Sequence, residues 1–289
     1  MMKRAQLRHF LALVESGNFT RAAERLAISQ PTLSASIAEL ERMAGTRLFL
    51  REKRQVRLTA AGARLVNHAR AIEREFRAAE AAFVEAPVPL APLRLGTIPS
   101  VSTAMLSAAV RRWTGPQPLT LVEGTDAELR RKLGEGQVDV ILTLLRPEDA
   151  DRPSLRLLEE GYRLLLPESH ALAGAALIDA RDVASETMIA RRSCEILGET
   201  SRWFTQRGVR PPFFLRSSND DRCIEMVRAG MGVTTAPQSL ARDGVVAVQL
   251  ADYDFRRTLG LVGGRDRPDL VAEEGALAEA LRAAFYFTA

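Results

Sequence analysis

One short stretch of the chain carries side chains whose types and helical spacing suit contacts with the edges of DNA bases. The residues that would form this face are Gln30, Pro31, Thr32, Ser34 and Ala35. A glutamine can hydrogen-bond the edge of an adenine, and small apolar groups can contact the methyl group of thymine. The face is uncharged, so a helix that carries it could approach a base pair closely.

A basic turn follows this stretch in the segment TRLFLREKRQVRLT, residues 46–59. Leu48 and Leu50, and then Val56 and Leu58, alternate around the turn in the manner of a β-hairpin. The basic residues of the hairpin are Arg51, Lys53, Arg54 and Arg57. Such residues bind phosphates or enter the minor groove, and they position a protein without reading sequence. We interpret the hairpin as a wing; a surface hairpin with incidental arginines is the alternative.

Two short helices are predicted to hold the uncharged face in place. Asn18 is suited to cap the first helix and Ser29 the second, with Pro31 in the first turn of the second. The apolar residues recur at helical spacing and are predicted to be buried: Phe19, Ala22, Ala23 and Leu26 in one helix, Leu33, Ile37 and Leu40 in the next, and Leu7, Phe10, Leu11 and Val14 in a helix before them. This pattern predicts a helix-turn-helix, whose second helix enters the major groove.

The segment LRHFLALVESGNFTRAAERLAISQPTLSASIAELERMAGTRLFLREKRQVRLTAAG, residues 7–62, resembles without a gap the N-terminal winged helix-turn-helix of LysR-type transcriptional regulators. The resemblance implies a DNA-binding domain over residues 1–59, with the motif at 18–41. The family usually has a basic or long polar pair where this chain has Ala35 and Ser36. We therefore expect readout that favours A·T pairs and groove shape.

The distribution of charge along the chain agrees with a polyanion-binding N-terminal part. Residues 1–65 contain 12 Lys and Arg against 5 Asp and Glu, a net charge of +7. The remaining 224 residues contain 28 basic and 31 acidic side chains, a net charge of −3. A basic module on a slightly acidic body favours nucleic-acid binding by the first and another task for the second.

A long helix is predicted over residues 60–86, starting after Thr59 as its cap. Its apolar positions are spaced alternately four and three residues apart, as in a two-helix seam: Leu65, Ala69, Ile72, Phe76, Ala79 and Phe83. We expect self-association along this seam, and the resemblance implies a dimer interface here. The alternative is a helix that packs on its own domain. The proline-rich residues 87–92 read as a stiff connector.

Residues 93–289 alternate strand-like and helix-like segments, which predicts an α/β domain with a largely parallel sheet. We expect two lobes, lobe I over 93–162 and 266–289 and lobe II over 163–265, joined by crossings near YRLLLPESHAL and RTLGLVGGRDRP. The resemblance covers this part more loosely. It implies a two-lobed effector-binding domain similar to periplasmic binding proteins, so the whole chain is predicted to be of mixed fold class.

Polar residues follow the predicted strands of lobe I, where α/β domains bind ligands. They are Ser100, Ser102, Thr125 and Arg146, with an apolar wall from Ile196, Leu197 or Phe204 of lobe II. Hydroxyls and an arginine at helix starts suit a small organic anion. For each polar residue alone, helix capping is the competing interpretation.

Other function classes find less support in the residues. No G-x-S-x-G, H-E-x-x-H, G-x-x-x-x-G-K-[ST] or G-x-G-x-x-G motif occurs, so we expect no enzyme, cofactor or metal site. A transport-type solute receptor is opposed by the basic front and by the lack of a signal peptide, so we expect a cytoplasmic, nucleoid-associated protein. A redox role for Cys194 is a further alternative, with Cys223 far along the chain. The expected partners are operator DNA, an effector, the chain itself as a homodimer or homotetramer and, if the protein activates, RNA polymerase.

Overall fold

The computed structural model describes residues 2–51, 56–81 and 90–286 of the chain. They form two compact units, one of residues 1–91 with the segment Arg130–Val138, and one of Pro92–Leu129 with Asp139–Ala289. We call the first the DNA-binding unit and the second the effector unit, after the roles expected from the sequence. Each unit is described by itself below.

Three helices form the front of the DNA-binding unit: α1 (Arg4–Ser16), α2 (Phe19–Arg25) and α3 (Gln30–Ala44). The predicted caps are confirmed. The Asn18 side chain accepts hydrogen bonds from the backbone N–H groups of Thr20 and Arg21, and Ser29 accepts one from Thr32. Gly17 and Gly45 end α1 and α3 in the left-handed conformation, which glycine adopts without steric cost.

The predicted apolar stripes meet in one core. Leu33, Ile37 and Leu40 of α3 are fully buried, and they pack with Leu7, Phe10 and Leu11 of α1 and with Ala22 and Ala23 of α2. Val14, Phe19 and Leu26 are partly buried against the same cluster. This core leaves the opposite side of α3 to solvent.

The wing is a hairpin of β1 (Phe49–Arg51) and β2 (Val56–Leu58), paired antiparallel with Phe49 opposite Leu58 and Leu50 opposite Arg57. The predicted alternation is wrong at one position. Phe49, rather than Leu50, faces the core, where its ring lies 5.2 Å from that of Phe10. Leu50 is 48% exposed and shares the outer face with Arg57.

Helix α4 (Ala60–Ala81) follows the wing, and the hydroxyl of Thr59 accepts a hydrogen bond from the backbone N–H of Gly62. Its two halves have different surroundings. Val66 and Ala69 are fully buried in the core of the DNA-binding unit, and Leu65 packs partly against it. Ile72 and Phe76 are 37% and 44% exposed. The first half therefore packs on its own domain, and the second half presents apolar side chains to solvent.

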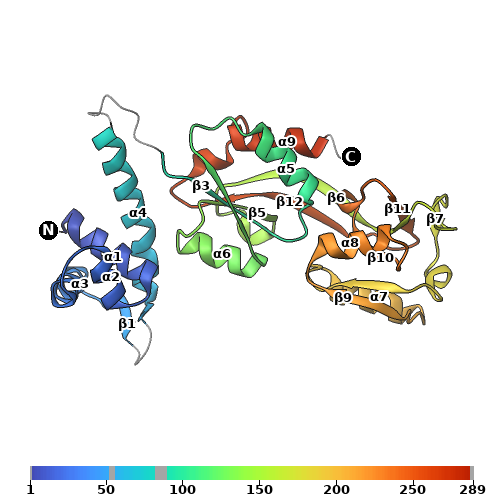
Figure 1. The fold of residues 1–289 in the computed structure, drawn as a ribbon, viewed down its shortest axis with the longest axis horizontal. Helices are drawn as coiled ribbons and strands as arrows, with labels where there is room; N and C mark the ends of the chain where they lie inside the picture. The colour runs from blue at the N-terminus through green and yellow to red at the C-terminus, as the bar shows by residue number, and fades with distance from the viewer. Residues whose placement is uncertain (1, 52–55, 82–89, 287–289) are drawn as a thin grey trace. The chain divides into compact units, whose positions relative to one another are not determined.

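The effector unit contains an eight-stranded sheet in the order β4-β3-β5-β12-β6-β11-β7, with β10 also paired to β6. In lobe I, β3 (Leu93–Thr97) pairs in parallel with β4 (Leu119–Glu123) and β5 (Val140–Leu144). The other elements of lobe I are α5 (Thr103–Arg112), η1 (Pro147–Asp149), η4 (Pro268–Val271) and α9 (Ala276–Tyr286). Helix α6 (Asp126–Gly134) begins in this unit and ends in the segment Arg130–Val138, which groups with the first unit. Helix α9 returns to lie beside α5, as Figure 1 shows.

Two strands cross between the lobes, β6 (Ser154–Pro167) and β12 (Arg256–Gly263) (Figure 1). They pair antiparallel with one another, and β12 also runs antiparallel to β5. The sheet is therefore mixed instead of largely parallel, because the crossing strands run against the strands that flank them.

Lobe II is built on the far half of β6, which pairs antiparallel with β10 (Thr234–Pro237) and β11 (Val245–Leu250). A two-stranded parallel sheet of β8 (Met188–Arg191) and β9 (Phe213–Ser217) lies alongside. The remaining elements are β7 (Leu177–Ile178), η2 (Ala180–Val183), α7 (Leu197–Gln206), α8 (Asp220–Arg228) and η3 (Gln238–Leu240).

Candidate DNA-binding face and effector sites

The N-terminal part of α3 presents the face that the sequence predicts. Gln30, Pro31, Thr32 and Ala35 are exposed and Ser34 is half-buried, while the core residues lie on the opposite side. The Thr32 hydroxyl is 2.7 Å from that of Ser29, within the helix cap. The face therefore offers small groups, the amide of Gln30 and the proline ring, with no charged side chain among them.

Ser36, the neighbour of Ala35, has a structural contact. Its hydroxyl lies 2.7 Å from Nδ1 of His9 on α1. Burial and the nearby Arg8 lower the pKa of His9, so the imidazole is neutral at physiological pH. Ser36 thus joins α3 to α1, and of the Ala35–Ser36 pair only Ala35 is exposed.

The structure describes only some of the residues that are predicted to form the wing contacts. Arg51 ends β1, and Lys53 and Arg54 lie outside the described residues. Arg57 is exposed on β2, and Arg47 is exposed just before β1. Phe83 at the end of the predicted seam also falls outside the described part, as do residues 87–89 of the connector 87–92.

The four polar residues predicted for the effector site lie at the ends of β3, β4 and β5. Ser100 is 1% exposed, whereas Ser102 is half-buried and makes no side-chain cap hydrogen bond. Thr125 is exposed and donates to the Glu128 carboxylate at 2.9 Å. Arg146 pairs with Asp126 at the start of α6. Capping and surface pairing therefore account for the present contacts of Thr125 and Arg146.

Ser100 belongs to a buried network that joins the two lobes. Its hydroxyl donates to the Glu195 carboxylate of lobe II and lies 2.9 Å from a terminal guanidinium nitrogen of Arg257. Arg257 also donates to the backbone carbonyl of Ser100 at 3.0 Å, to Glu195 at 2.9 Å and to Glu160 at 2.9 Å. Tyr162 donates to the other carboxylate oxygen of Glu195 at 3.0 Å. We call these residues the inter-lobe network: Ser100, Glu160, Tyr162, Glu195 and Arg257.

The electrostatics of the network favour an ionised Glu195. Burial by itself would raise the pKa of this carboxyl, but the charge of Arg257 and the hydrogen bond from Ser100 hold the pKa below its ordinary value. The carboxylate of Glu195 therefore accepts, at Ser100, the hydrogen bond that was expected for an effector carboxylate.

Sequence reasoning missed the charged residues of this network, although a signal for two of them exists. Arg257 is the second residue of β12, and Glu160 lies in the middle of β6. The two are direct partners in the register of β12 and β6. Opposite charges at matching places in two crossing strands could have identified this pair; Glu195 lies in a loop and carries no such signal.

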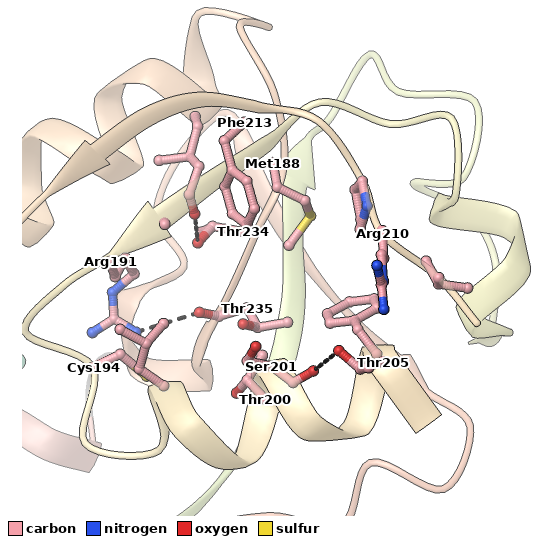
Figure 2. A pocket seen from close by; sticks show the side chains of 16 residues that line it. Met188, Arg191, Cys194, Thr200, Ser201, Thr205, Arg210, Phe213, Thr234 and Thr235 are labelled. Atoms are coloured by element: carbon pink, nitrogen blue, oxygen red, sulfur yellow. Dashed lines mark hydrogen bonds between the residues drawn. The ribbon is translucent and has the colours of Figure 1, made fainter. Parts of the chain in front are cut away.

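The predicted apolar wall divides between two places in lobe II. Leu197 and Phe204 of α7 line a cavity of about 330 Å³ inside the lobe, while Ile196 packs against the lobe core. The cavity is lined by residues 188–235 alone, so Ser100, Ser102, Thr125 and Arg146 do not contribute to it. Figure 2 shows its polar side chains, with Arg191 and Cys194 at one end.

The described residues contain no group of three or more His, Cys, Asp or Glu side chains that could hold a metal ion. Cys194 is half-buried and Cys223 fully buried, and both are free thiols. Within the described part of the chain, no helix is long and apolar enough to cross a membrane.

A winged helix-turn-helix joined to a two-lobed ligand-binding domain defines a class of DNA-binding regulators. The family model for the lysR family of bacterial regulatory helix-turn-helix proteins matches residues 5–63, and the model for the LysR substrate binding domain matches residues 89–285. The chain belongs to the LysR family of transcriptional regulators.

Its similarity to known regulators extends over almost the whole chain. It is 31% identical over 287 residues to the DNA-binding transcriptional dual regulator OxyR of Escherichia coli K12, covering 96% of this chain and 94% of that protein. The hydrogen peroxide-inducible genes activator of E. coli O6:H1 matches with the same identity and coverage. A full-length OxyR cysteine-to-aspartate variant from Pseudomonas aeruginosa superposes with a TM-score of 0.70 and 26% identity, covering 98% of this chain and 95% of that one.

Proposed function

We propose that this regulator binds a pseudo-palindromic operator as a homodimer or homotetramer and responds to a small organic anion in its effector domain. It acts by binding and not by catalysis, in the cytoplasm at the nucleoid, and contacts RNA polymerase if it activates. The observation that carries the DNA-binding part is the exposed, uncharged face of α3, formed by Gln30, Pro31, Thr32, Ser34 and Ala35.

The proposed division of labour follows from the chemistry of the two elements. The small side chains of α3 suit thymine methyls, and Gln30 suits an adenine edge. Arg51, Lys53 and Arg54 of the wing supply phosphate or minor-groove contacts, which add affinity without reading bases. Exposed Arg57 supports this role for the wing. Readout should therefore favour A·T pairs and groove shape.

Ala35→Arg tests the proposed reading face, with Ala44→Arg as its matched control. Both alanines are exposed on α3, but they are nine residues apart and so face opposite sides of the helix. Ala35→Arg should create a preference for guanine in each half-site, worth about 1–3 kcal/mol, in a selection from random DNA. Ala44→Arg should leave base preferences unchanged. Identical preferences in the parent and Ala35→Arg would show that position 35 does not face bases.

The proposed effector site is the lobe I edge with Ser100, Ser102 and Thr125, and with Arg146 at its rim. The hydrogen bond from Ser100 to the Glu195 carboxylate makes the proposal more specific, because a carboxylate of the protein already occupies the position beside Ser100. An effector carboxylate would have to compete with Glu195 for Ser100 and Arg257. Ligand binding would then replace a contact between the lobes with a contact to the ligand. A lobe arrangement that keeps the Ser100–Glu195 contact and one that has lost it would therefore bind the ligand with different affinities.

A calorimetric screen of carboxylic acids on the full-length protein tests this site. A hit should bind Ser100→Ala and Thr125→Val more weakly than the parent. Glu195→Gln should bind it more tightly, because the competing carboxylate is gone. Equal affinity in the parent and all three variants would reject the site.

Peroxide sensing is a second candidate, favoured by the matched hydrogen peroxide-inducible genes activator. The thiol environments count against it. Burial raises the pKa of the Cys194 thiol and raises that of Cys223 to about 11, whereas reaction with peroxide needs the thiolate. We therefore expect DNA binding to be the same before and after stoichiometric hydrogen peroxide. A change that Cys194→Ser abolishes would favour the redox mechanism instead.

A further inference from the structure

The cavity inside lobe II is bounded by α7, by β8, by the start of β9 and by β10. Its volume is about 330 Å³, at the lower end of the usual range for small-molecule pockets. Figure 2 shows Met188 and Phe213 on one side and the side chains of α7 on the other. Its apolar walls include Met188, Leu197, Phe204, Val209 and Phe213.

Arg191, at one end of this cavity, is a buried cation that its protein partners leave incompletely bonded. It is 1% exposed, pairs with Asp220 and donates weakly to the backbone carbonyl of Thr235 at 3.4 Å. Its Nε–H is the one buried side-chain polar group without a hydrogen-bond partner among the described residues. A buried donor without an acceptor is costly, so an acceptor in the cavity would stabilise it.

Three threonines of the cavity already form hydrogen bonds within the protein, and the second arginine of the lining, Arg210, is exposed. The Thr200 hydroxyl is 2.6 Å from that of Tyr253, and Thr234 donates to the carbonyl of Ile189 at 2.7 Å. Thr205 donates to the carbonyl of Ser201 at 2.8 Å. Arg191 therefore supplies the buried donor, and the surrounding walls supply mainly apolar contact.

The charge balance indicates what the acceptor should be. Asp220 already neutralises Arg191, and Ser193 donates to the same Asp220 carboxylate at 2.7 Å. The other arginine of the lining, Arg210, is exposed and lies on the opposite side of the cavity in Figure 2. A carboxylate bonded to Arg191 would enter beside a satisfied ion pair and would lose its hydration without gaining a new counter-ion there. An uncharged oxygen avoids that cost.

We propose that the lobe II cavity binds a small, uncharged, largely apolar compound whose carbonyl oxygen accepts a hydrogen bond from Nε of Arg191. This site differs from the carboxylate site proposed in lobe I, because none of Ser100, Ser102, Thr125 and Arg146 lines the cavity. A ketone, an aldehyde or an ester with an aromatic or branched apolar body fits the description.

The site is also connected to the contact between the lobes. Arg191 and Cys194 line the cavity, and the next residue in the same loop, Glu195, bonds Ser100 and Arg257 across the lobes. A ligand that shifts this loop changes the inter-lobe network. This regulatory consequence rests on the proposed function, whereas binding itself does not.

Calorimetry on the full-length protein with three matched probes tests the site. Acetophenone has a ring and a carbonyl oxygen, ethylbenzene lacks the oxygen, and benzoate replaces it with a carboxylate. Acetophenone should bind roughly tenfold or more tightly than ethylbenzene, as expected for a hydrogen bond to a charged donor, and more tightly than benzoate. Arg191→Lys keeps the charge beside Asp220 but removes the Nε–H, so the preference over ethylbenzene should disappear.

A cavity-filling variant keeps the test valid even if Arg191→Lys does not fold. Ser201→Phe, at an exposed position of α7 that lines the cavity, should abolish acetophenone binding. Gln206→Phe, exposed on the same helix and outside the lining, should leave it unchanged.

Three results would overturn the proposal: no saturable binding of acetophenone up to its solubility limit, tighter binding of benzoate, or unchanged acetophenone binding in Ser201→Phe. DNA binding of the parent without probe is measured separately. Its absence would overturn the proposed function and leave the cavity result standing.

Discussion

Arg257 is a buried cation whose guanidinium contacts groups from both lobes, and its replacement should be among the most damaging in the effector unit. Arg257→Met would leave Glu160 and Glu195 buried without their cation, at a cost of about 3–5 kcal/mol. Arg256→Met is the control, because Arg256 pairs with Glu159 at the exposed surface and should cost at most about 1 kcal/mol.

Urea unfolding followed by tryptophan fluorescence measures this difference. Both tryptophans of the chain, Trp113 and Trp203, lie in the effector unit, so the signal reports that unit. Equal losses of stability in the two variants would contradict the assigned roles.

The lowered pKa of Glu195 leads to a pH dependence with a definite sign. In the folded state the Glu195 carboxyl stays ionised at pH values below its ordinary pKa of 4.5. Its contribution to the free energy of unfolding is therefore present above pH 4.5 and is lost as the pH falls through the pKa of the folded state. The free energy of unfolding of the parent should exceed that of Glu195→Gln at pH 7, and the gap should narrow below pH 4.5. A gap that is constant from pH 7 to pH 3 would contradict the ionised state.

The residues that could be predicted from sequence are those whose role is local. Asn18, Ser29 and Thr59 act within one turn of the helix they cap, so position alone identified them. The inter-lobe network could not be found in this way, because Ser100 and Arg257 are 157 residues apart and meet only through the tertiary fold.

At the scale of elements, α4 combines the two interpretations that its apolar spacing allowed. The first half of the seam packs on the DNA-binding unit at Leu65 and Ala69. The second half leaves Ile72 and Phe76 exposed, although the guanidinium of Arg4 lies 4.5 Å from the centre of the Phe76 ring. We infer that the partner protomer covers this second half.

The double variant Ile72→Glu, Phe76→Glu should therefore dissociate the oligomer. Carboxylates facing a second copy of the same helix would repel one another and lose hydration. Arg64→Glu, exposed on the same helix and outside the seam, should keep the parental oligomer. Sedimentation velocity distinguishes the three proteins. A double variant that sediments like the parent would rule out this interface.

The predicted wing shows where pattern reasoning fails at the element scale. Leu48, Leu50, Val56 and Leu58 suggested a simple alternation, but three apolar residues in a row, Leu48, Phe49 and Leu50, leave the inner face undefined. Tertiary packing decides it, because Phe49 fits beside Phe10 in the helical core. Longer helices with clear periodicity, such as α3, left no such ambiguity.

At the scale of the whole molecule, the contrast in charge between the two parts matches their proposed tasks. The front carries a net charge of +7 over residues 1–65 and the remainder −3. The fold class could be predicted because the helix-turn-helix signature is continuous along the chain. The lobe II cavity could not, because its lining residues come from segments spread over residues 188–235 and become neighbours only in the folded lobe.

The central claim is that an oligomer of this chain reads two half-sites through paired α3 helices. Selection of the full-length parent on random DNA, followed by footprinting of the enriched sequences, tests it most directly. We predict inverted, A·T-rich half-sites whose centres lie about 34 Å apart or a multiple of that distance. Enrichment of no sequence, or of a single half-site without a symmetry-related copy, would contradict the claim.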